Sequence, residues 1–223
     1  MHKSTNFVIL DNDILNNSLT SKEIYKQQYI NHQINNILKI YKQAKIMVVG
    51  PCEHITTIKN KKVRYVHHAL EPMTNTGEML QEILHYINDN ISLAIMNASM
   101  FFDPVIMSTI DMKKSSMIIN RYKKFESKIG CTIVNDKIDF VFYDLNNKLC
   151  EFLYIHKKDI PKLKQVISDQ VSKRMYLFEI INTLINNQID IYPYTINKNI
   201  IHFRQNNMHQ IRNYIRKASN VLI

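Results

Sequence analysis

Polar side chains follow two apolar segments of the chain, at the points where each segment ends. Asp11 and Asp13 follow residues 7–10, and Asn97 follows residues 93–96. Short apolar runs that end in polar residues predict buried strands, and ligand crevices form at the carboxyl ends of parallel strands. Two carboxylates repel a phosphate group unless a metal ion lies between them, so Asp11 and Asp13 are candidate ligands of a divalent cation.

A third carboxylate, Asp103, directly precedes Pro104. It is either a displaced metal ligand or, as is more typical of an Asp-Pro pair, the N-cap of a helix that begins with proline. His54, His67 and His68 are further candidate metal ligands, but no additional ligand stands at a recognisable spacing from them. We therefore expect these histidines on the surface or in loops.

The composition is that of a globular domain. The chain has 223 residues, and its 45% hydrophobic content suffices for a sizeable core. No apolar stretch approaches the roughly 18 residues of a membrane span and no signal peptide is visible, so we expect a cytoplasmic protein without a membrane partner. Cys52, Cys131 and Cys150 are widely spaced, which predicts reduced thiols rather than disulfides or a zinc site.

The chain is strongly basic, with a formal net charge of +10. Such a charge suits a polyanionic partner. However, the lysines and arginines are scattered, and no basic run alternates with aromatic residues as a single-strand-binding surface requires. We therefore do not expect nucleic acid as the partner.

Predicted strands and helices alternate in the first half of the chain. Helical spacing of apolar residues starts at Tyr29, and a second helix is expected after Asn75, where Glu78 completes a capping box. Short apolar runs around these helices predict strands at residues 46–49, 63–66 and 93–96. This alternation implies a mostly parallel sheet that is covered by helices on both faces.

The second half of the chain differs because its sequence predicts antiparallel strands. Residues 131–134 and 138–143 flank a polar turn and predict a hairpin. Further strands are expected at residues 117–119, 149–155, 189–192 and 200–203, and helices at 158–167, 177–185 and 208–215. The predicted fold is a single α/β domain of three layers, with a mixed, mostly parallel sheet and a small antiparallel insertion.

Several short segments follow one another in an order that is typical of one protein family. They are residues 7–10, Lys22 with the helix after it, 47–50, the turn Thr74-Asn75-Thr76-Gly77, 95–104, 149–155, 176–182 and 200–204. In this order they resemble the sugar-phosphate nucleotidylyltransferases and their relatives that activate choline phosphate or phosphonates. The resemblance covers nearly the whole chain and implies the GT-A-like, Rossmann-like fold of the nucleotide-diphospho-sugar transferases.

The resemblance also implies roles for parts of the chain. Residues 1–110 are the nucleotide-binding half and residues 111–223 the half that receives the acceptor. The catalytic positions fall on Lys22 and Arg204, and Asp11, Asp13 and Asp103 are the residues left to bind Mg²⁺. The implied nucleotide contacts are Leu10, Asp11, Asn75, Thr76, Gly77, Asn97 and Ser99.

The chain departs from the family at its catalytic motifs. Active members carry a glycine-rich loop with an arginine after the first strand, whereas residues 11–20 contain neither. Only glycine lets backbone N–H groups approach a triphosphate closely enough to cradle it. Ser99, and Phe203 or Arg204, stand where the family binds Mg²⁺ with aspartates, and they cannot replace anionic ligands. The resemblance therefore implies a catalytically degenerate member, a pseudoenzyme that binds a nucleotide, a sugar phosphate or a sister protein.

Two enzymatic alternatives stay open. In the first, Asp11 and Asp13 rebuild a Mg²⁺ site, and the protein transfers a nucleoside monophosphate to a sugar phosphate, choline phosphate or phosphonate. In the second, the Asp-x-Asp segment is similar to the opening of haloacid-dehalogenase-type phosphatases, with Asp11 as nucleophile and Asp13 as general acid. Arg204 is either a fixed positive charge that holds a phosphate without metal or a surface residue. A homo- or hetero-oligomer is compatible with each of these functions.

Overall fold

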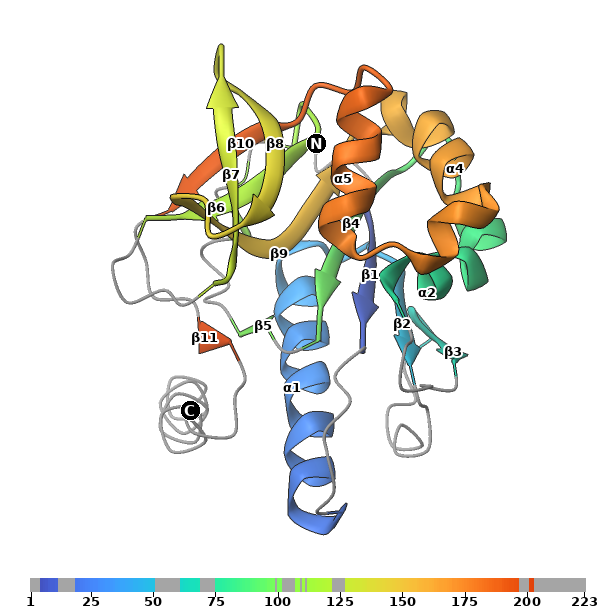
Figure 1. Ribbon diagram of the computed structural model, residues 1–223. Helices are drawn as coiled ribbons and strands as arrows, with labels where there is room; N and C mark the ends of the chain where they lie inside the picture. The colour runs from blue at the N-terminus through green and yellow to red at the C-terminus, as the bar shows by residue number, and fades with distance from the viewer. Residues whose placement is uncertain are drawn as a thin grey trace.

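The computed structural model of the chain describes residues 5–11, 19–50, 61–68, 75–98, 100–101, 107–108, 110, 112–121, 127–196 and 201–202. The side chains of residues 19–29, 101 and 201–202 are not described. Figure 1 shows strands in the middle of the molecule and helices around them. The predicted final helix, at residues 208–215, lies outside the described residues.

The described strands form one nine-stranded sheet and a separate pair. They are β1 (Thr5–Leu10), β2 (Ile46–Gly50), β3 (Val63–His67), β4 (Ser92–Asn97), β5 (Met100–Phe101), β6 (Ser116–Asn120), β7 (Ile129–Val134), β8 (Lys137–Tyr143), β9 (Asn147–Ile155), β10 (Tyr192–Ile196) and β11 (Ile201–His202). The main path of the sheet is β10-β6-β9-β4-β1-β2-β3, and β7 joins it through β9 and carries β8. The pair is β5 with β11, which are antiparallel.

The sheet is mixed and mostly parallel, as predicted. β1 is parallel to both β2 and β4, β2 is parallel to β3, and β6 is parallel to β10. β9 runs antiparallel to its neighbours β4 and β6. The predicted antiparallel insertion is the β7–β8 hairpin, whose turn residues Asn135 and Asp136 have φ of 50° and 60°. Asn and Asp tolerate this left-handed conformation better than most side chains do.

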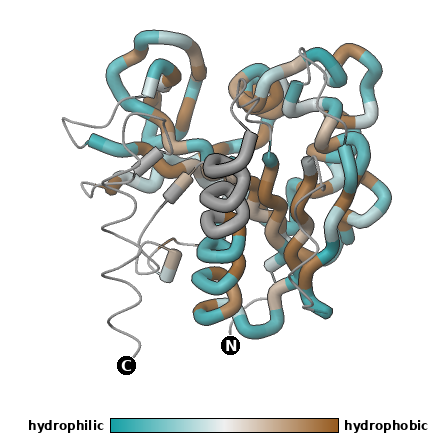
Figure 2. The backbone as a smooth tube through the Cα atoms, turned by 90° about the horizontal axis from the view of Figure 1, so that it is seen from below, coloured by the Kyte–Doolittle hydropathy of each residue, from teal (hydrophilic) through white to brown (hydrophobic). Residues whose placement is uncertain are grey.

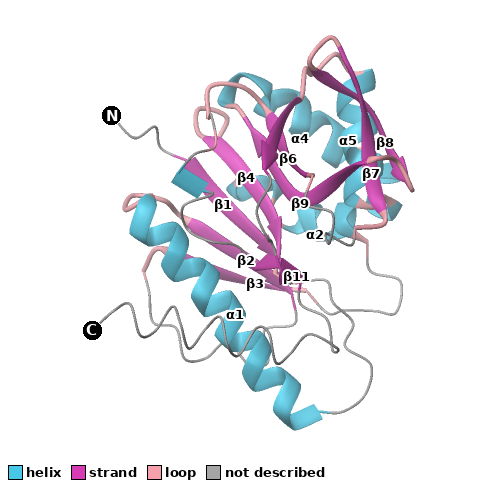
Figure 3. Cartoon of the chain, turned by 90° about the vertical axis from the view of Figure 1, so that its left-hand side faces the viewer, coloured by secondary structure: helices cyan, strands magenta, loops and turns pink. Residues whose placement is uncertain are grey.

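Helices cover both faces of the sheet. They are α1 (Leu19–Ile40), α2 (Thr76–Glu82), α4 (Ile160–Ser168) and α5 (Leu177–Asn186), with short 3-10 helices η2 (Leu84–Tyr86), η3 (Lys157–Asp159) and η4 (Gln170–Arg174). Figure 3 shows α1 on one face and α2, α4 and α5 on the other. The three-layer α/β architecture that the sequence predicts is therefore confirmed.

The core consists of two apolar clusters, one on each face of the sheet. Side chains alternate along a strand, so Phe7 and Ile9 of β1 pack in the cluster with α1, while Val8 and Leu10 pack in the other. The same strand is buried over its whole length. This two-sided burial explains why the central strands are continuous apolar runs in the sequence, and Figure 2 shows hydrophobic colour concentrated in the interior strands.

Two predicted boundaries and one predicted capping contact need correction. α1 begins at Leu19 rather than Tyr29, because its first half is rich in helix-forming Lys, Glu and Gln and lacks the apolar repeat that was used to find it. Asn75 is the N-cap of α2, but its side chain makes no capping hydrogen bond. Ile189 and Ile191 are buried in the core, yet strand pairing begins only at Tyr192.

The described cysteines agree with the predicted reduced thiols. Cys131 and Cys150 are free and buried, and Cys52 lies outside the described residues. Burial raises the pKa of the Cys131 thiol to about 11 and raises that of Cys150 further, so both stay protonated near neutral pH. Within the described part of the chain, no helix is long and apolar enough to cross a membrane.

Candidate functional site

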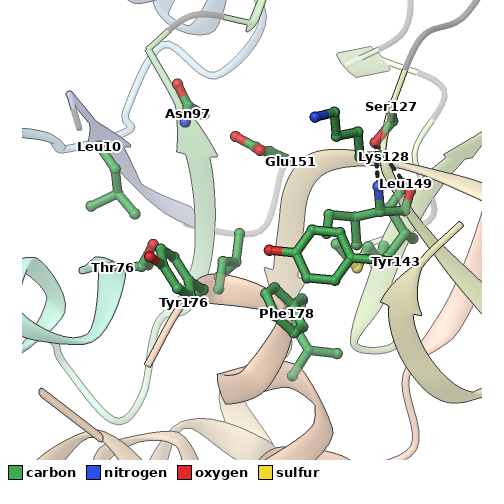
Figure 4. Close-up of a pocket in the computed structure, with 14 residues that line it drawn as sticks. Leu10, Thr76, Asn97, Ser127, Lys128, Tyr143, Leu149, Glu151, Tyr176 and Phe178 are labelled. Atoms are coloured by element: carbon green, nitrogen blue, oxygen red, sulfur yellow. Dashed lines mark hydrogen bonds between the residues drawn. The ribbon is translucent and has the colours of Figure 1, made fainter. Parts of the chain in front are cut away.

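A cavity of about 300 Å³ opens at the carboxyl ends of β1 and β4. It lies on the face of the sheet that carries α2 and α5, and the β7–β8 hairpin forms one of its sides (Figure 4). Its lining residues are Leu10, Thr76, Asn97, Met117, Ser127, Lys128, Ile129, Tyr143, Leu149, Glu151, Tyr176, Leu177, Phe178 and Ile181. This is the edge of the sheet at which the sequence predicts ligand binding.

Three neighbouring strands contribute one row of side chains to the cavity. Leu10 of β1 is in register with Asn97 of β4, and both are the last residues of parallel strands. The pairing of Met96 with Phe152 places Asn97 next to Glu151 of β9. Figure 4 shows the Asn97 amide and the Glu151 carboxylate side by side at the top of the cavity. An amide and a carboxylate together offer a hydrogen-bond donor and a negative charge to a ligand.

Aromatic rings form the opposite side of the cavity. We call Phe142, Tyr143, Tyr176 and Phe178 the aromatic cluster; the last three line the cavity. The ring centroids of Tyr143 and Phe178 are 5.3 Å apart, and those of Tyr176 and Phe178 are 6.0 Å apart. Tyr143 and Tyr176 remain 45% and 53% exposed, so their rings are accessible to a ligand. Exposed aromatic faces bind flat or cationic groups.

The cluster joins two segments that are distant in the sequence. Asn182 of α5 accepts a hydrogen bond from the Val141 N–H at 2.9 Å and donates one to the Val141 carbonyl at 2.8 Å. The side-chain amide thus pairs with β8 as a neighbouring strand would, and it fixes the hairpin against α5. At the start of α5, the Tyr176 N–H donates to the Glu179 carboxylate at 2.7 Å. The Glu179 carboxylate is therefore held to the N-terminal turn of α5.

Lys128 and Glu151 are the charged residues among those that line the cavity. Lys128 is exposed, and its carbonyl accepts a hydrogen bond from the Asp144 N–H at 2.8 Å, so the backbone at its position is held to the end of β8. The two charges come from different elements, the segment before β7 and β9 itself. A ligand with both a negative and a positive group matches this pair.

Several predicted contacts lie at the cavity and others do not. Leu10, Thr76 and Asn97 line it, whereas Asn75 and Gly77 are not among its lining residues. Asp11 is 3% exposed and is not a lining residue either, because side chains alternate and Leu10 already faces the cavity. The nucleotide-binding roles of these residues stay predictions.

The structure gives Gly77 a packing function. Its N–H donates to the Met175 carbonyl at 2.9 Å, and a Cβ added there would lie 1.6 Å from the Ser172 carbonyl oxygen. α2 therefore approaches η4 at a distance that only glycine allows. This contact brings Thr76 next to the segment that carries Tyr176, and both residues line the cavity (Figure 4).

Gly50 likewise has a close neighbour, at the end of β2. A Cβ there would lie 2.7 Å from the Asp11 Cβ and 2.8 Å from the Asp11 carbonyl oxygen. The Asp11 N–H donates to the Val49 carbonyl at 2.8 Å, which extends the pairing of β1 and β2 by one residue. Gly50 is therefore the residue that leaves room for Asp11.

The remaining predicted site residues are not placed. Outside the described residues lie Ser99, Asp13, Asp103 and Arg204. Lys22 belongs to α1, but its side chain is not described. The lining residues that sequence reasoning missed come from β6, the segment before β7, the β7–β8 hairpin, β9 and the start of α5. The aromatic residues among them had a signal in the sequence, namely the aromatic-rich segments at 140–143 and 176–178.

The described residues do not make up a magnesium site. No three or more His, Cys, Asp or Glu side chains among them are close enough together to hold a metal ion. His68 is 8% exposed and lies 4.0 Å from the Glu82 carboxylate, whereas His67 is exposed. His54 lies outside the described residues.

The fold is shared with solved nucleotidylyltransferases. A CTP:phosphocholine cytidylyltransferase of Streptococcus pneumoniae is 13% identical, with a TM-score of 0.74 over 95% of this chain and 99% of that one. A structure described as a glucose-1-phosphate thymidylyltransferase of Bacillus anthracis is 11% identical, with a TM-score of 0.68 over 89% of both chains. An inositol-1-phosphate CTP transferase of T. maritima is 8% identical, with a TM-score of 0.65 over 89% of this chain and 87% of that one.

These likenesses establish the fold and confirm, at that level, the resemblance seen in the sequence. No protein-family model and no curated protein matches the sequence. Function must therefore be argued from the site itself.

Proposed function

We propose that the protein binds a phosphorylated small molecule in the cavity and does not carry out ordinary magnesium-dependent nucleotidyl transfer. The observation that carries the binding function is the cavity itself. It lies at the carboxyl ends of β1 and β4 and combines Asn97 and Glu151 with Lys128 and three aromatic rings. Apolar walls with a few convergent polar groups are typical of small-molecule sites.

The use of glycine in the chain supports the loss of ordinary catalysis. The sequence has three glycines, Gly50, Gly77 and Gly130. A Cβ at any of them would lie within 3 Å of another segment, namely Asp11, Ser172 and Leu145. All three are therefore used for packing, and the loop after β1 has no glycine that would let backbone N–H groups surround a triphosphate.

The polar groups of the cavity favour a phosphorylated ligand that also carries an organic cation. Lys128 supplies a positive charge for the phosphate, and Glu151 supplies a negative charge for the cation. Tyr143, Tyr176 and Phe178 add ring faces, which attract ammonium groups. One structural neighbour is named for its action on phosphocholine, a ligand of this charge pattern.

Calorimetric titration tests the proposal directly. We expect phosphocholine to bind in the presence of EDTA, more tightly than choline or glucose 1-phosphate, because only phosphocholine carries both charges. CTP belongs in the same series because the fold is that of nucleotidylyltransferases. If none of these probes binds at millimolar concentration, or if binding requires Mg²⁺, the proposal is wrong.

A pair of tyrosine variants tests the site. Tyr176→Ala removes a ring that lines the cavity, whereas Tyr86→Ala removes a 38% exposed ring that is not among the lining residues. A cation–π contact contributes about 0.5–2 kcal/mol, so Tyr176→Ala should weaken phosphocholine binding by roughly 2- to 30-fold. Tyr86→Ala should leave the affinity unchanged. Equal effects of the two variants would place the ligand elsewhere.

A further inference from the structure

Gln33 of α1 makes an unusual set of contacts with the turn that follows β4. Its side chain is buried, with 2% exposure. Its Nε2 donates to the Asn97 carbonyl at 3.1 Å, to the Ala98 carbonyl at 3.3 Å and to the Met100 carbonyl. One side chain thus meets three backbone carbonyls of a single turn.

These contacts match what the turn requires. Carbonyl oxygens accept hydrogen bonds, so only a donor is suitable at the point where the three converge, and a primary amide supplies two N–H groups there. Buried carbonyls without a donor are costly, and Asn97 and Ala98 lie at the end of the β4 ladder. On the β1 side, the Ala98 N–H donates to the Leu10 carbonyl at 2.8 Å. The turn is therefore held by β1 and by Gln33.

The turn has contacts on both faces of the sheet. Gln33 belongs to α1, which covers the face opposite the cavity, as Figure 3 shows. Asn97, whose carbonyl accepts from Gln33, places its own side chain in the cavity. A shift of this turn would therefore move the Asn97 amide relative to Glu151.

We infer that Gln33 is a positioning residue for the cavity, which holds the β4–β5 turn and thereby sets the place of the Asn97 amide. Gln33 is not among the residues that line the cavity, so it acts through the turn. The effect on ligand binding rests on the proposed function, whereas the hold on the turn is a property of the folded chain alone.

Amide hydrogen exchange of the Ala98 N–H separates this inference from a merely structural role. Gln33→Met keeps the length of the side chain but leaves the three carbonyls without this donor. The matched control is Ile37→Ala, which removes a fully buried side chain of the same helix from the core. A loss of global stability speeds hydrogen exchange at all protected amides together. Release of the turn speeds exchange at the Ala98 N–H alone.

We expect Gln33→Met to speed exchange at Ala98 by roughly tenfold relative to Val8 and Ile9 of β1, and Ile37→Ala to change all of these amides in parallel. Parallel acceleration in both variants would overturn the inference. If Gln33→Met does not fold, Gln33→Asn is measured instead. It withdraws the same amide by one methylene group, and the same local acceleration at Ala98 is expected.

Titration with phosphocholine then tests the consequence for the site. Gln33→Met should weaken binding by roughly tenfold at a temperature where it is fully folded, while Ile37→Ala should not. Unchanged affinity in Gln33→Met would show that the turn does not position Asn97 for the ligand. If the wild type binds no probe, the proposed function fails, and the exchange result at Ala98 still decides whether Gln33 holds the turn.

Discussion

Substitution of Gly77 by alanine tests how closely α2 packs against η4 beside the cavity. The new Cβ would lie 1.6 Å from the Ser172 carbonyl oxygen, which is backbone and cannot rotate away. The neighbouring backbone is also fixed, because the Ser172 hydroxyl donates to the Val166 carbonyl at 2.6 Å. From α2, Gln81 donates to the Ile167 carbonyl at 2.6 Å. Relief of the clash therefore requires α2 to move away from η4.

The expected cost can be estimated from three contributions. Overpacking of this kind costs about 3 kcal/mol, at the upper end of its usual range, because the contact is with backbone. Displacement of α2 also loses the hydrogen bond from Gly77 to Met175, which contributes about 1 kcal/mol. Alanine gains about 1 kcal/mol over glycine as a helix former. The net loss is about 3 kcal/mol, or about 6–12 °C in Tm for a chain of this size.

Urea unfolding followed by far-UV circular dichroism, with calorimetry for Tm, measures this loss. Glu82→Ala is the control, since it changes an exposed residue of the same helix and should alter stability by less than about 0.5 kcal/mol. If Gly77→Ala leaves the free energy of unfolding unchanged or increases it, helix propensity outweighs the contact. The close approach of α2 to η4 would then not explain this glycine.

Two further predictions concern groups that are not among the residues that line the cavity. Burial lowers the pKa of His32 below its ordinary value of 6.5, and its Nε2 lies 2.7 Å from the Asn36 amide nitrogen. The unfolded chain therefore takes up the proton first as the pH falls, so stability is lost below about pH 6.5. His32→Gln should flatten the dependence of Tm on pH between about 7 and 5, and an unaltered slope would refute this. Asn182→Ala leaves the buried Val141 N–H and carbonyl without their partner, which should cost about 2 kcal/mol in urea unfolding. Asn186→Ala, at an exposed position of the same helix, should cost much less, and equal losses would contradict the role of the Asn182 amide.

The strands of the sheet could be predicted because burial on both faces is visible in the sequence itself. β1, β2 and β4 each lie between two apolar layers, so each is a run of apolar residues that stands out from polar neighbours. The first half of α1 lacks that signal, since its residues are mostly polar. Its start was therefore missed although its propensity for helix is high.

The part of the candidate site that depends on local sequence could be predicted, whereas the part that depends on residues distant in the sequence could not. Asn97 could be placed at the cavity because it ends an apolar run, and the end of a parallel strand has a known position. Gly77 was expected to contact a nucleotide, but its neighbour in space, Ser172, is far away in the sequence. The aromatic cluster likewise joins the hairpin to α5. Such pairings depend on the packing of elements, which no local pattern encodes.

Release of pyrophosphate is the measurement that tests the central claim most directly. The wild type would be assayed with Mg²⁺, each nucleoside triphosphate, and phosphocholine or a sugar 1-phosphate as acceptor. A double variant that replaces Asp11 and Asp13 by asparagine is the control for a rebuilt metal site. We predict release at the background rate for both proteins, because the chain has no glycine available for a triphosphate loop. A turnover of about 1 s⁻¹ or more in the wild type, lost in the double variant, would contradict the proposed loss of catalysis.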